Sequence, residues 1–186
     1  MTVVFLDRDG VINENKPNGY VKSWDEFAFI PGAKEALRKL AETDGVKIFI
    51  VSNQAGVGKG LVSAAQVEEV NVQMKRAVEA AGGRIDGILY CPHKVEDRCP
   101  DRKPEPGLLL RALRQNRKYA RDRFIVGDAL SDVAAGKKVA AVAILVKTGR
   151  GRDELKSIGE DDNSKPDYIA EDISEATDII LQRICH

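Results

Sequence analysis

Short apolar runs rich in strand-forming residues alternate along this chain with segments of helical spacing. The runs lie at residues 3–6, 46–51, 85–90, 124–126, 141–146 and 168–170. Between them apolar residues recur three or four positions apart, as in the segment 33–41, and Ser63 is a suitable cap for a long helix that ends near Ala81. This alternation predicts an α/β fold built on a doubly wound, mostly parallel sheet.

The size and charge of the chain limit the classes of protein to which it can belong. Its 186 residues suit one well-filled core, so we expect a single domain over residues 1–186. Acidic and basic residues balance at 29 each, which gives no indication of a nucleic-acid or membrane partner. No apolar stretch reaches the roughly 20 residues of a membrane span, and the predicted first strand follows no leader-like segment. We expect a monomer in the cytoplasm.

Acidic side chains follow two of the predicted strands. The first strand leads directly to Asp7 and then to Asp9, and the fourth leads to Asp128. The carboxyl ends of parallel strands meet at one edge of a sheet, where open α/β sheets place their ligands. Two acids there can hold a divalent cation and leave one free to attack a substrate or transfer a proton. Read alone, Asp-x-Asp-Gly is also typical of a solvated turn.

A hydroxyl and an amine are expected at the same edge of the sheet. Ser52 follows the second strand, and Lys103 lies just before a predicted helix. The Lys103 ammonium, together with a metal ion, would balance the charge of the acids beside an anionic substrate. The Ser52 hydroxyl and nearby backbone amides can donate to anionic oxygens. The set suits phosphoryl transfer to a carboxylate nucleophile.

Two of the three cysteines lie in a short segment with other metal-binding residue types. Cys91 and His93 are two residues apart, and Cys99 and Asp101 follow at the same spacing. Cysteine, histidine and carboxylate side chains all bind zinc, the carboxylate less strongly where the site is thiolate-rich. We therefore interpret residues 91–103 as a candidate loop for a structural zinc ion. The alternative is a loop that holds no metal.

Four motifs, in this order, resemble those of the haloacid dehalogenase (HAD) superfamily of phosphatases, over essentially the whole chain. They are Asp7-Arg8-Asp9-Gly10, Ser52, Lys103-Pro104 and the sequence from Gly127-Asp128 to Asp132. The longer sequences at 7–13, 52–56 and 102–104 are similar to those of the D-glycero-D-manno-heptose 1,7-bisphosphate phosphatases and the related histidinol-phosphate phosphatases. Ala129 stands where the heptose enzymes usually carry lysine, so the histidinol-phosphate phosphatases remain the alternative.

The resemblance implies a Rossmann-like core and a Mg²⁺-dependent phosphomonoesterase that works through an aspartyl-phosphate intermediate. Asp7 would be the nucleophile, and Asp9 the general acid and then the general base. The side chains of Asp7 and Asp128 and the carbonyl group of Asp9 would hold Mg²⁺.

The resemblance also implies roles for the residues around this pair. Ser52 and Lys103 would bind the phosphoryl group that is transferred. Asp132 would orient Lys103 or a metal-bound water. The alternative for Asp132 is an acid at a helix start, which the helix dipole favours. In the cysteine loop the resembling families carry Cys-x-Cys, where this chain has Cys99 and Asp101.

HAD phosphatases often carry a separate cap domain, but this chain leaves no room for one. The segment 13–31 is too short, and the segment 52–85 holds only a glycine-rich turn and a helix. The loops 91–101 and 20–24 are therefore the expected covers of the site. We expect a small phosphorylated metabolite as substrate, a heptose bisphosphate first and histidinol phosphate second. The expected substrate contacts are Asn53, Arg102 and Lys147.

Two functions of other kinds fit the same motifs. A binding protein could keep the fold without activity, although all the expected catalytic residues are present. A nucleic-acid 3′-phosphatase would be expected to show a basic track or an added nucleic-acid module, and the sequence shows neither.

Overall fold

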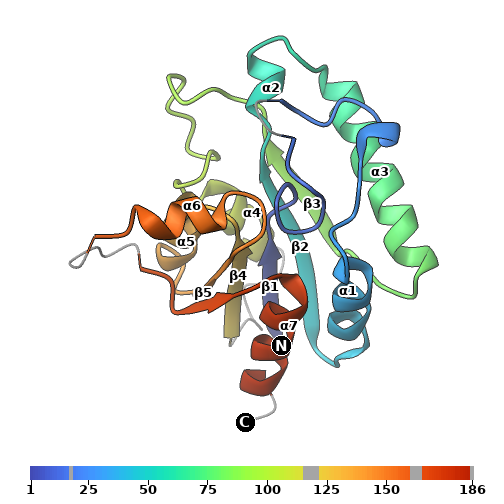
Figure 1. Cartoon of the computed structure of the whole chain (residues 1–186), viewed down its shortest axis with the longest axis vertical. Helices are drawn as coiled ribbons and strands as arrows, with labels where there is room; N and C mark the ends of the chain where they lie inside the picture. Colours follow the sequence, from blue (N-terminus) through green and yellow to red (C-terminus); the bar gives the residue numbers. More distant parts are fainter. Residues whose placement is uncertain (17–18, 115–121, 160–164, 185–186) are drawn as a thin grey trace.

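One sheet of six parallel strands forms the centre of the molecule. A computed structural model describes residues 1–16, 19–114, 122–159 and 165–184 (Figure 1). In order across the sheet the strands are β3 (Gly87–Cys91), β2 (Val46–Asn53), β1 (Thr2–Leu6), β4 (Asp122–Gly127), β5 (Val142–Val146) and β6 (Tyr168–Ala170). The predicted α/β fold with a doubly wound sheet is confirmed, and within the described residues every strand pair is parallel.

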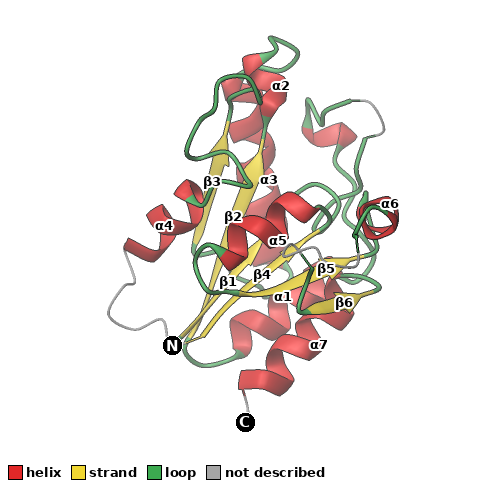
Figure 2. Cartoon of the chain, turned by 90° about the vertical axis from the view of Figure 1, so that its left-hand side faces the viewer, coloured by secondary structure: helices red, strands yellow, loops and turns green. Residues whose placement is uncertain are grey.

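Helices cover both faces of this sheet (Figures 1 and 2). They are α1 (Ala33–Glu42), α2 (Ala55–Gly58), α3 (Ala64–Ala80), α4 (Gly107–Arg114), α5 (Leu130–Lys137), α6 (Gly151–Lys156) and α7 (Ile173–Ile184), and a short 3₁₀ helix, η1 (Trp24–Glu26), precedes α1. Alternate residues of β1 pack into two separate cores: Val4 and Leu6 lie with α1, α3 and α7, and Val3 and Phe5 with α4 and α5. The uninterrupted apolar run of β1 follows from burial on both faces.

The cap of α3 follows the predicted pattern. Ser63 precedes the helix, its hydroxyl accepts a bond from the backbone N–H of Gln66, and the Gln66 side chain accepts one from the Ser63 N–H. This reciprocal pair satisfies two backbone donors at the start of the helix.

Two elements differ from the sequence prediction. The third strand begins at Gly87 and not at Ile85, because the Asp86 carboxylate accepts the Ile48 N–H and so satisfies a donor beside the start of the strand. The segment 151–165, predicted as a loop, begins with helix α6. Leu155 of α6 packs against the core beneath it, which explains why this polar segment is ordered as a helix. The rest of that prediction falls partly on residues 160–164, outside the described residues.

No helix in the described part of the chain combines the length and the apolar character needed to cross a membrane.

Candidate active site

Three buried carboxylates meet at the carboxyl edge of the sheet. Leu6 of β1 pairs with Val126 of β4, and the Asp7 N–H extends this ladder by donating to the Val126 carbonyl at 2.9 Å. This register brings Asp7 beside Asp128, and helix α5 adds Asp132. The three acids are all buried, and each offers a carboxylate oxygen within 4.8 Å of the other two. The predicted convergence of Asp7 with Asp128 is present in the structure.

Lys103 is the buried cation of this cluster. Its Nζ lies 3.0 Å from Asp7 Oδ1 and 2.5 Å from Asp132 Oδ1, and it donates to the Val51 carbonyl at 2.7 Å. Burial alone would lower the pKa of Lys103, but the carboxylates of Asp132 and Asp7 outweigh burial and raise it. Lys103 is therefore held as a cation between two acids.

Asp132 combines the two roles that the sequence leaves open. One carboxylate oxygen pairs with Lys103, and the other accepts the backbone N–H of Ala129 at the start of α5. The helix-start contact fixes the side chain, and the fixed side chain in turn orients Lys103.

The acids are more numerous than the cations that face them. Burial raises the pKa of Asp7 to about 7, and Asp132, Asp128 and Asp9 add to this rise while Lys103 opposes it. Burial, followed by the charge of Asp132, raises the pKa of Asp128 to about 6. Carboxyls with raised pKa values in one crevice mark a site where a further positive charge would be stabilised.

Asp128 shows where such a charge could bind. Its Oδ2 accepts bonds from Asn15 Nδ2 and from the Arg150 N–H, each at 2.9 Å. Oδ1 is buried without a hydrogen-bond partner among the described residues, and it forms an ion pair with Arg150 Nη2 at 3.7 Å. A side chain at Gly10 would place its Cβ 2.2 Å from Asp128 Oδ2, and Gly10 has a φ of +86°, so glycine is required there. A buried oxygen that accepts no hydrogen bond and a donor set made only of carboxylates fit a hard divalent cation such as Mg²⁺.

These pKa shifts predict how the stability of the metal-free protein depends on pH. Asp7 and Asp128 have folded pKa values of about 7 and about 6, above the value of 3.8 expected for the unfolded chain. Between about pH 4 and pH 7 the folded state therefore binds more protons than the unfolded state, and its free energy of unfolding should fall as the pH rises. Thermal unfolding with a chelator across this range measures the fall.

Mg²⁺ should reduce this loss, because an ion that binds only the folded state stabilises it. Asp128→Asn is the comparison variant, and it should show a shallower fall without metal and a smaller gain with Mg²⁺. A stability of the wild type that rises steadily from about pH 5 to pH 7 without metal would contradict the expectation.

Asp9 lies beside this cluster in a different environment. Its Oδ1 accepts bonds from Asn13 Nδ2 and Arg8 Nη2, and its Oδ2 from Gln54 Nε2 and the same Nη2, at distances between 2.7 and 3.1 Å. Burial alone would raise the pKa of Asp9, but the charge of Arg8 and these hydrogen bonds lower it. Asp9 is therefore ionised at neutral pH, whereas Asp7, with a pKa of about 7, is only partly ionised there. The sequence assigned no role to Arg8, Asn13 or Gln54, although all three lie within the quoted motifs.

Ser52 and Asn53 lie at the end of β2. Ser52 is buried, lines the crevice, and its hydroxyl oxygen accepts a bond from Gln54 Nε2 at 2.8 Å. The Asn53 amide is engaged at both ends, since Nδ2 donates to the Lys103 carbonyl and Oδ1 accepts the Lys103 N–H. The Asn53 side chain thus fixes the backbone of Lys103, and because Asn53 also lines the crevice, its contact with substrate stays a prediction.

The crevice above the acids has a volume of 1370 Å³. Tyr20 and the loop around residues 95–104 line it, where the sequence placed the two covers. Its basic lining residues, besides Lys103, are Lys16, Lys59, Arg98, Arg102 and Arg150. Lys147 is not among the lining residues, and its ammonium pairs with Glu171. The expected substrate contact of Lys147 is therefore not supported.

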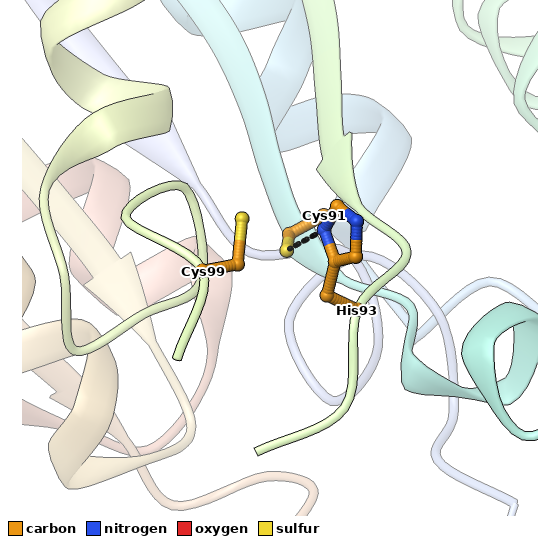
Figure 3. Close-up of side chains that lie close together, drawn as sticks. All are labelled: Cys91, His93 and Cys99. Atoms are coloured by element: carbon orange, nitrogen blue, oxygen red, sulfur yellow. Dashed lines mark hydrogen bonds between the residues drawn. The ribbon is translucent and has the colours of Figure 1, made fainter. Parts of the chain in front are cut away.

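The cysteine loop forms a second candidate metal site (Figure 3). Ligand atoms of Cys91, His93 and Cys99 lie within 4.8 Å of one another, with Cys91 Sγ 3.6 Å from His93 Nδ1. Asp101 does not join them, because its carboxylate accepts a bond from Arg111 at 2.9 Å. Burial raises the pKa of the Cys91 thiol to about 11 in this metal-free arrangement. The structure brings together three of the four residues predicted as zinc ligands.

Comparisons with known proteins agree with this geometry. Residues 101–176 match the family model described as HAD-hydrolase-like. The chain is 36% identical over 184 residues to D-glycero-beta-D-manno-heptose-1,7-bisphosphate 7-phosphatase of Pasteurella multocida, covering 95% of each protein. It is 43% identical over 141 residues to the D-glycero-alpha-D-manno-heptose-1,7-bisphosphate 7-phosphatase of Mycobacterium tuberculosis, covering 75% of this chain and 74% of that one.

A solved structure shows the same similarity over nearly the whole chain. It is the crystal structure of D,D-heptose 1,7-bisphosphate phosphatase from Bordetella bronchiseptica, complexed with magnesium and phosphate. The two chains superpose with a TM-score of 0.89 at 33% identity, over 98% of this chain and 99% of that one.

Proposed function

Because this chain belongs to the heptose-1,7-bisphosphate 7-phosphatases, a family of HAD-like hydrolases, we propose that it removes the 7-phosphate of a D-glycero-D-manno-heptose 1,7-bisphosphate. The observation that carries the proposal is the buried cluster of Asp7, Lys103, Asp128 and Asp132 at the floor of the crevice. The cluster supports the proposal because it would offer one bound phosphate a carboxylate to act as nucleophile, a cation, and an acidic oxygen of Asp128 that accepts no hydrogen bond.

Asp7 attacks phosphorus in the first step. Its Oδ1 accepts the Arg8 N–H and pairs with Lys103, which leaves Oδ2 as the attacking oxygen. A bond forms between Oδ2 and phosphorus, and the bond from phosphorus to the sugar oxygen breaks. Asp9 gives its proton to that leaving oxygen. Lys103 and the Ser52 hydroxyl bind the oxygens of the phosphoryl group while it is transferred.

Asp9 completes the cycle in the second step. It takes a proton from a water molecule, the water oxygen attacks phosphorus, and the acyl-phosphate bond breaks to release phosphate and the Asp7 carboxylate. The free site holds Asp9 ionised, so the acid form must arise in the substrate complex. A phosphate dianion beside Asp9 favours that protonation, because like charges disfavour ionisation.

A divalent cation bound beside Asp7 would assist the first step. Asp7 and Asp128 would hold Mg²⁺ through their side chains, with the Asp9 carbonyl group as a further ligand. When bound, Mg²⁺ supplies positive charge that offsets the repulsion between these acids and the phosphate.

Phosphate release from defined substrates tests the function. Both anomers of the heptose bisphosphate should lose one phosphate in the presence of Mg²⁺, with kcat/KM well above that for histidinol phosphate. The relatives include enzymes named for each anomer, so the two are assayed side by side. Efficient release from histidinol phosphate and none from either heptose bisphosphate would overturn the proposal.

Arg102 is a basic residue of the crevice wall whose side chain is held by a hydrogen bond within the cysteine loop. Its Nη1 donates to the His93 carbonyl at 3.0 Å, which holds the guanidinium at the wall beside Lys103. We expect Arg102→Gln to raise KM for the heptose bisphosphate by roughly 10- to 100-fold, the effect of losing a charged hydrogen bond. KM for 4-nitrophenyl phosphate, which lacks the polar remainder of the substrate, should change much less.

Arg111→Gln is the matched control, because Arg111 pairs with Asp101 and does not line the crevice. It should leave both KM values unchanged. Equal increases for the two substrates in Arg102→Gln would show that Arg102 serves the transferred phosphate instead.

The cysteine loop is proposed to bind a structural zinc ion through Cys91, His93 and Cys99. Protein prepared without metal-affinity resin, from cells supplied with zinc, should contain close to one zinc per chain by elemental analysis. Cys99→Ser should lose most of this zinc and should also loosen the loop that carries Arg102. Asp101→Asn should retain it, because Asp101 pairs with Arg111. Wild-type protein without zinc under these conditions would leave the metal-free loop as the correct interpretation.

A further inference from the structure

A buried arginine lies directly behind the proposed acid–base residue. The Arg8 side chain is 1% exposed, and its Nη2 donates to both carboxylate oxygens of Asp9, at 3.1 and 3.0 Å. Asn13 and Gln54 donate to one oxygen each. Among these three donors Arg8 is the charged one and the one that reaches both oxygens. It therefore restricts rotation of the Asp9 carboxylate more strongly than either amide.

A second contact fixes Arg8 itself. Its Nη1 donates at 3.1 Å to Oδ1 of Asn71, a buried polar residue in the middle of α3. A buried asparagine on a helix requires a partner, and Arg8 supplies it. A chain of hydrogen bonds thus runs from α3 through Arg8 to Asp9. It ends at the crevice, where the Asp9 side chain is 24% exposed.

Stability alone does not explain a charged residue at this position. Removing an arginine and a carboxylate from water is costly, and apolar residues of similar volume often stabilise a core as well or better. Arg8 Nε is buried without a hydrogen-bond partner among the described residues, which adds to the cost. The contact that offsets this cost is the one to Asp9, whose carboxylate must stay within hydrogen-bond reach of the leaving oxygen.

We propose that Arg8, held by Asn71, is a positioning residue that fixes the Asp9 carboxylate for proton transfer to the leaving oxygen. The proposal rests on the proposed function, because it takes Asp9 as the acid. The Arg8 side chain contacts Asp9 and not Asp7, while its backbone N–H, which any replacement residue keeps, donates to Asp7 Oδ1. Loss of the side chain should therefore impair protonation of the leaving group and spare the attack by Asp7.

Leaving groups of different basicity separate these two effects. A sugar alkoxide requires a proton to leave, whereas 4-nitrophenolate leaves without one. Arg8→Met should lower kcat/KM for the heptose bisphosphate by roughly 10²-fold and that for 4-nitrophenyl phosphate by less than about threefold. We choose kcat/KM because it reports the steps up to cleavage of the ester bond, before Asp9 acts as base with either substrate.

Three further variants grade and control the effect. The measured quantity is the ratio of kcat/KM for the heptose bisphosphate to kcat/KM for 4-nitrophenyl phosphate. Asn71→Leu should lower this ratio less than Arg8→Met does, since Arg8 still contacts Asp9 and loses only its hydrogen bond to Asn71. Arg8→Lys should recover part of the activity, because an ammonium keeps the charge but cannot reach Asn71 and both Asp9 oxygens with a planar fork. Arg84→Met removes another multiply bonded arginine, one that contacts Asp86 and the carbonyl groups of Ala41 and Val46. It should alter stability but not the ratio.

Each outcome decides the proposal. Equal losses with both substrates in Arg8→Met, or no loss, would show that Arg8 serves the fold alone. Crystal structures of the wild type and Arg8→Met give a measurement independent of activity: the Asp9 side chain should rotate in the variant, and an unchanged position would overturn the proposal. If the wild type does not cleave a heptose bisphosphate, the proposed function fails, while the crystal comparison and a simple alkyl phosphate still test Arg8.

Discussion

Asp7→Asn is expected to abolish phosphate release while the protein remains folded. An amide cannot form the bond to phosphorus, so the loss should be on the order of 10⁴-fold or more, as for other removed nucleophiles. Asn keeps the shape of the side chain and removes a charge that burial and the neighbouring acids disfavour, since the pKa of Asp7 is raised to about 7. At about pH 8 without metal, the variant should therefore be at least as stable as the wild type.

Initial rates with the heptose bisphosphate and thermal unfolding measure the two effects together. Beryllofluoride, which mimics a phosphoryl group on a carboxylate, should attach to Asp7 in the wild type and not in the variant. Asp153→Asn is the control: Asp153 lines the same crevice, but its side chain is 84% exposed and pairs with Lys156. It should keep nearly full activity. Full activity in Asp7→Asn would remove the basis of the assigned chemistry.

Asp9→Asn is the substitution with the second largest expected effect. Turnover should fall by roughly 10²- to 10⁴-fold, because both the protonation of the leaving group and the activation of water depend on this carboxylate. With 4-nitrophenyl phosphate the first step needs no acid, so the variant should release a burst of 4-nitrophenolate and then stall. The stalled protein should carry one phosphoryl group on Asp7.

Intact-protein mass spectrometry during the stall identifies that phosphoryl group, and peptide mapping locates it. The double variant Asp7→Asn with Asp9→Asn is the control and should show neither burst nor added mass. A negligible loss of turnover in Asp9→Asn would show that another group transfers the proton.

Much of the fold could be predicted because the strands are buried on both faces. An uninterrupted apolar run such as β1 has few alternatives to a central parallel strand, and the polar residue that ends it marks the edge of the sheet. Prediction failed where a side chain replaced a backbone contact, as Asp86 does before β3. It also failed where one apolar residue, Leu155, was enough to dock a short polar helix.

The same distinction holds for the site. The placement of Asp7 with Asp128 followed from strand ends alone, because parallel strands bring their carboxyl ends together. The support of Asp9 could not be predicted, since Asn71 is 63 residues from Arg8 and meets it only through the packing of α3. Lys147 follows a strand as the sequence suggested, but its ammonium pairs with Glu171, a nearby charge that no strand pattern reveals.

The adjacency of Arg102 and Lys103 limits how this enzyme can change its substrate during evolution. Lys103 is anchored to the end of β2 by the paired hydrogen bonds of Asn53, so its backbone cannot shift without moving a residue of the cluster. The backbone of Arg102 is restricted by the same anchor, because Arg102 directly precedes Lys103. Insertions and deletions between His93 and Cys99 lie farther from the anchor and can reshape the wall of the crevice. New specificities should therefore arise through the length and side chains of that stretch, while the chemistry stays constant.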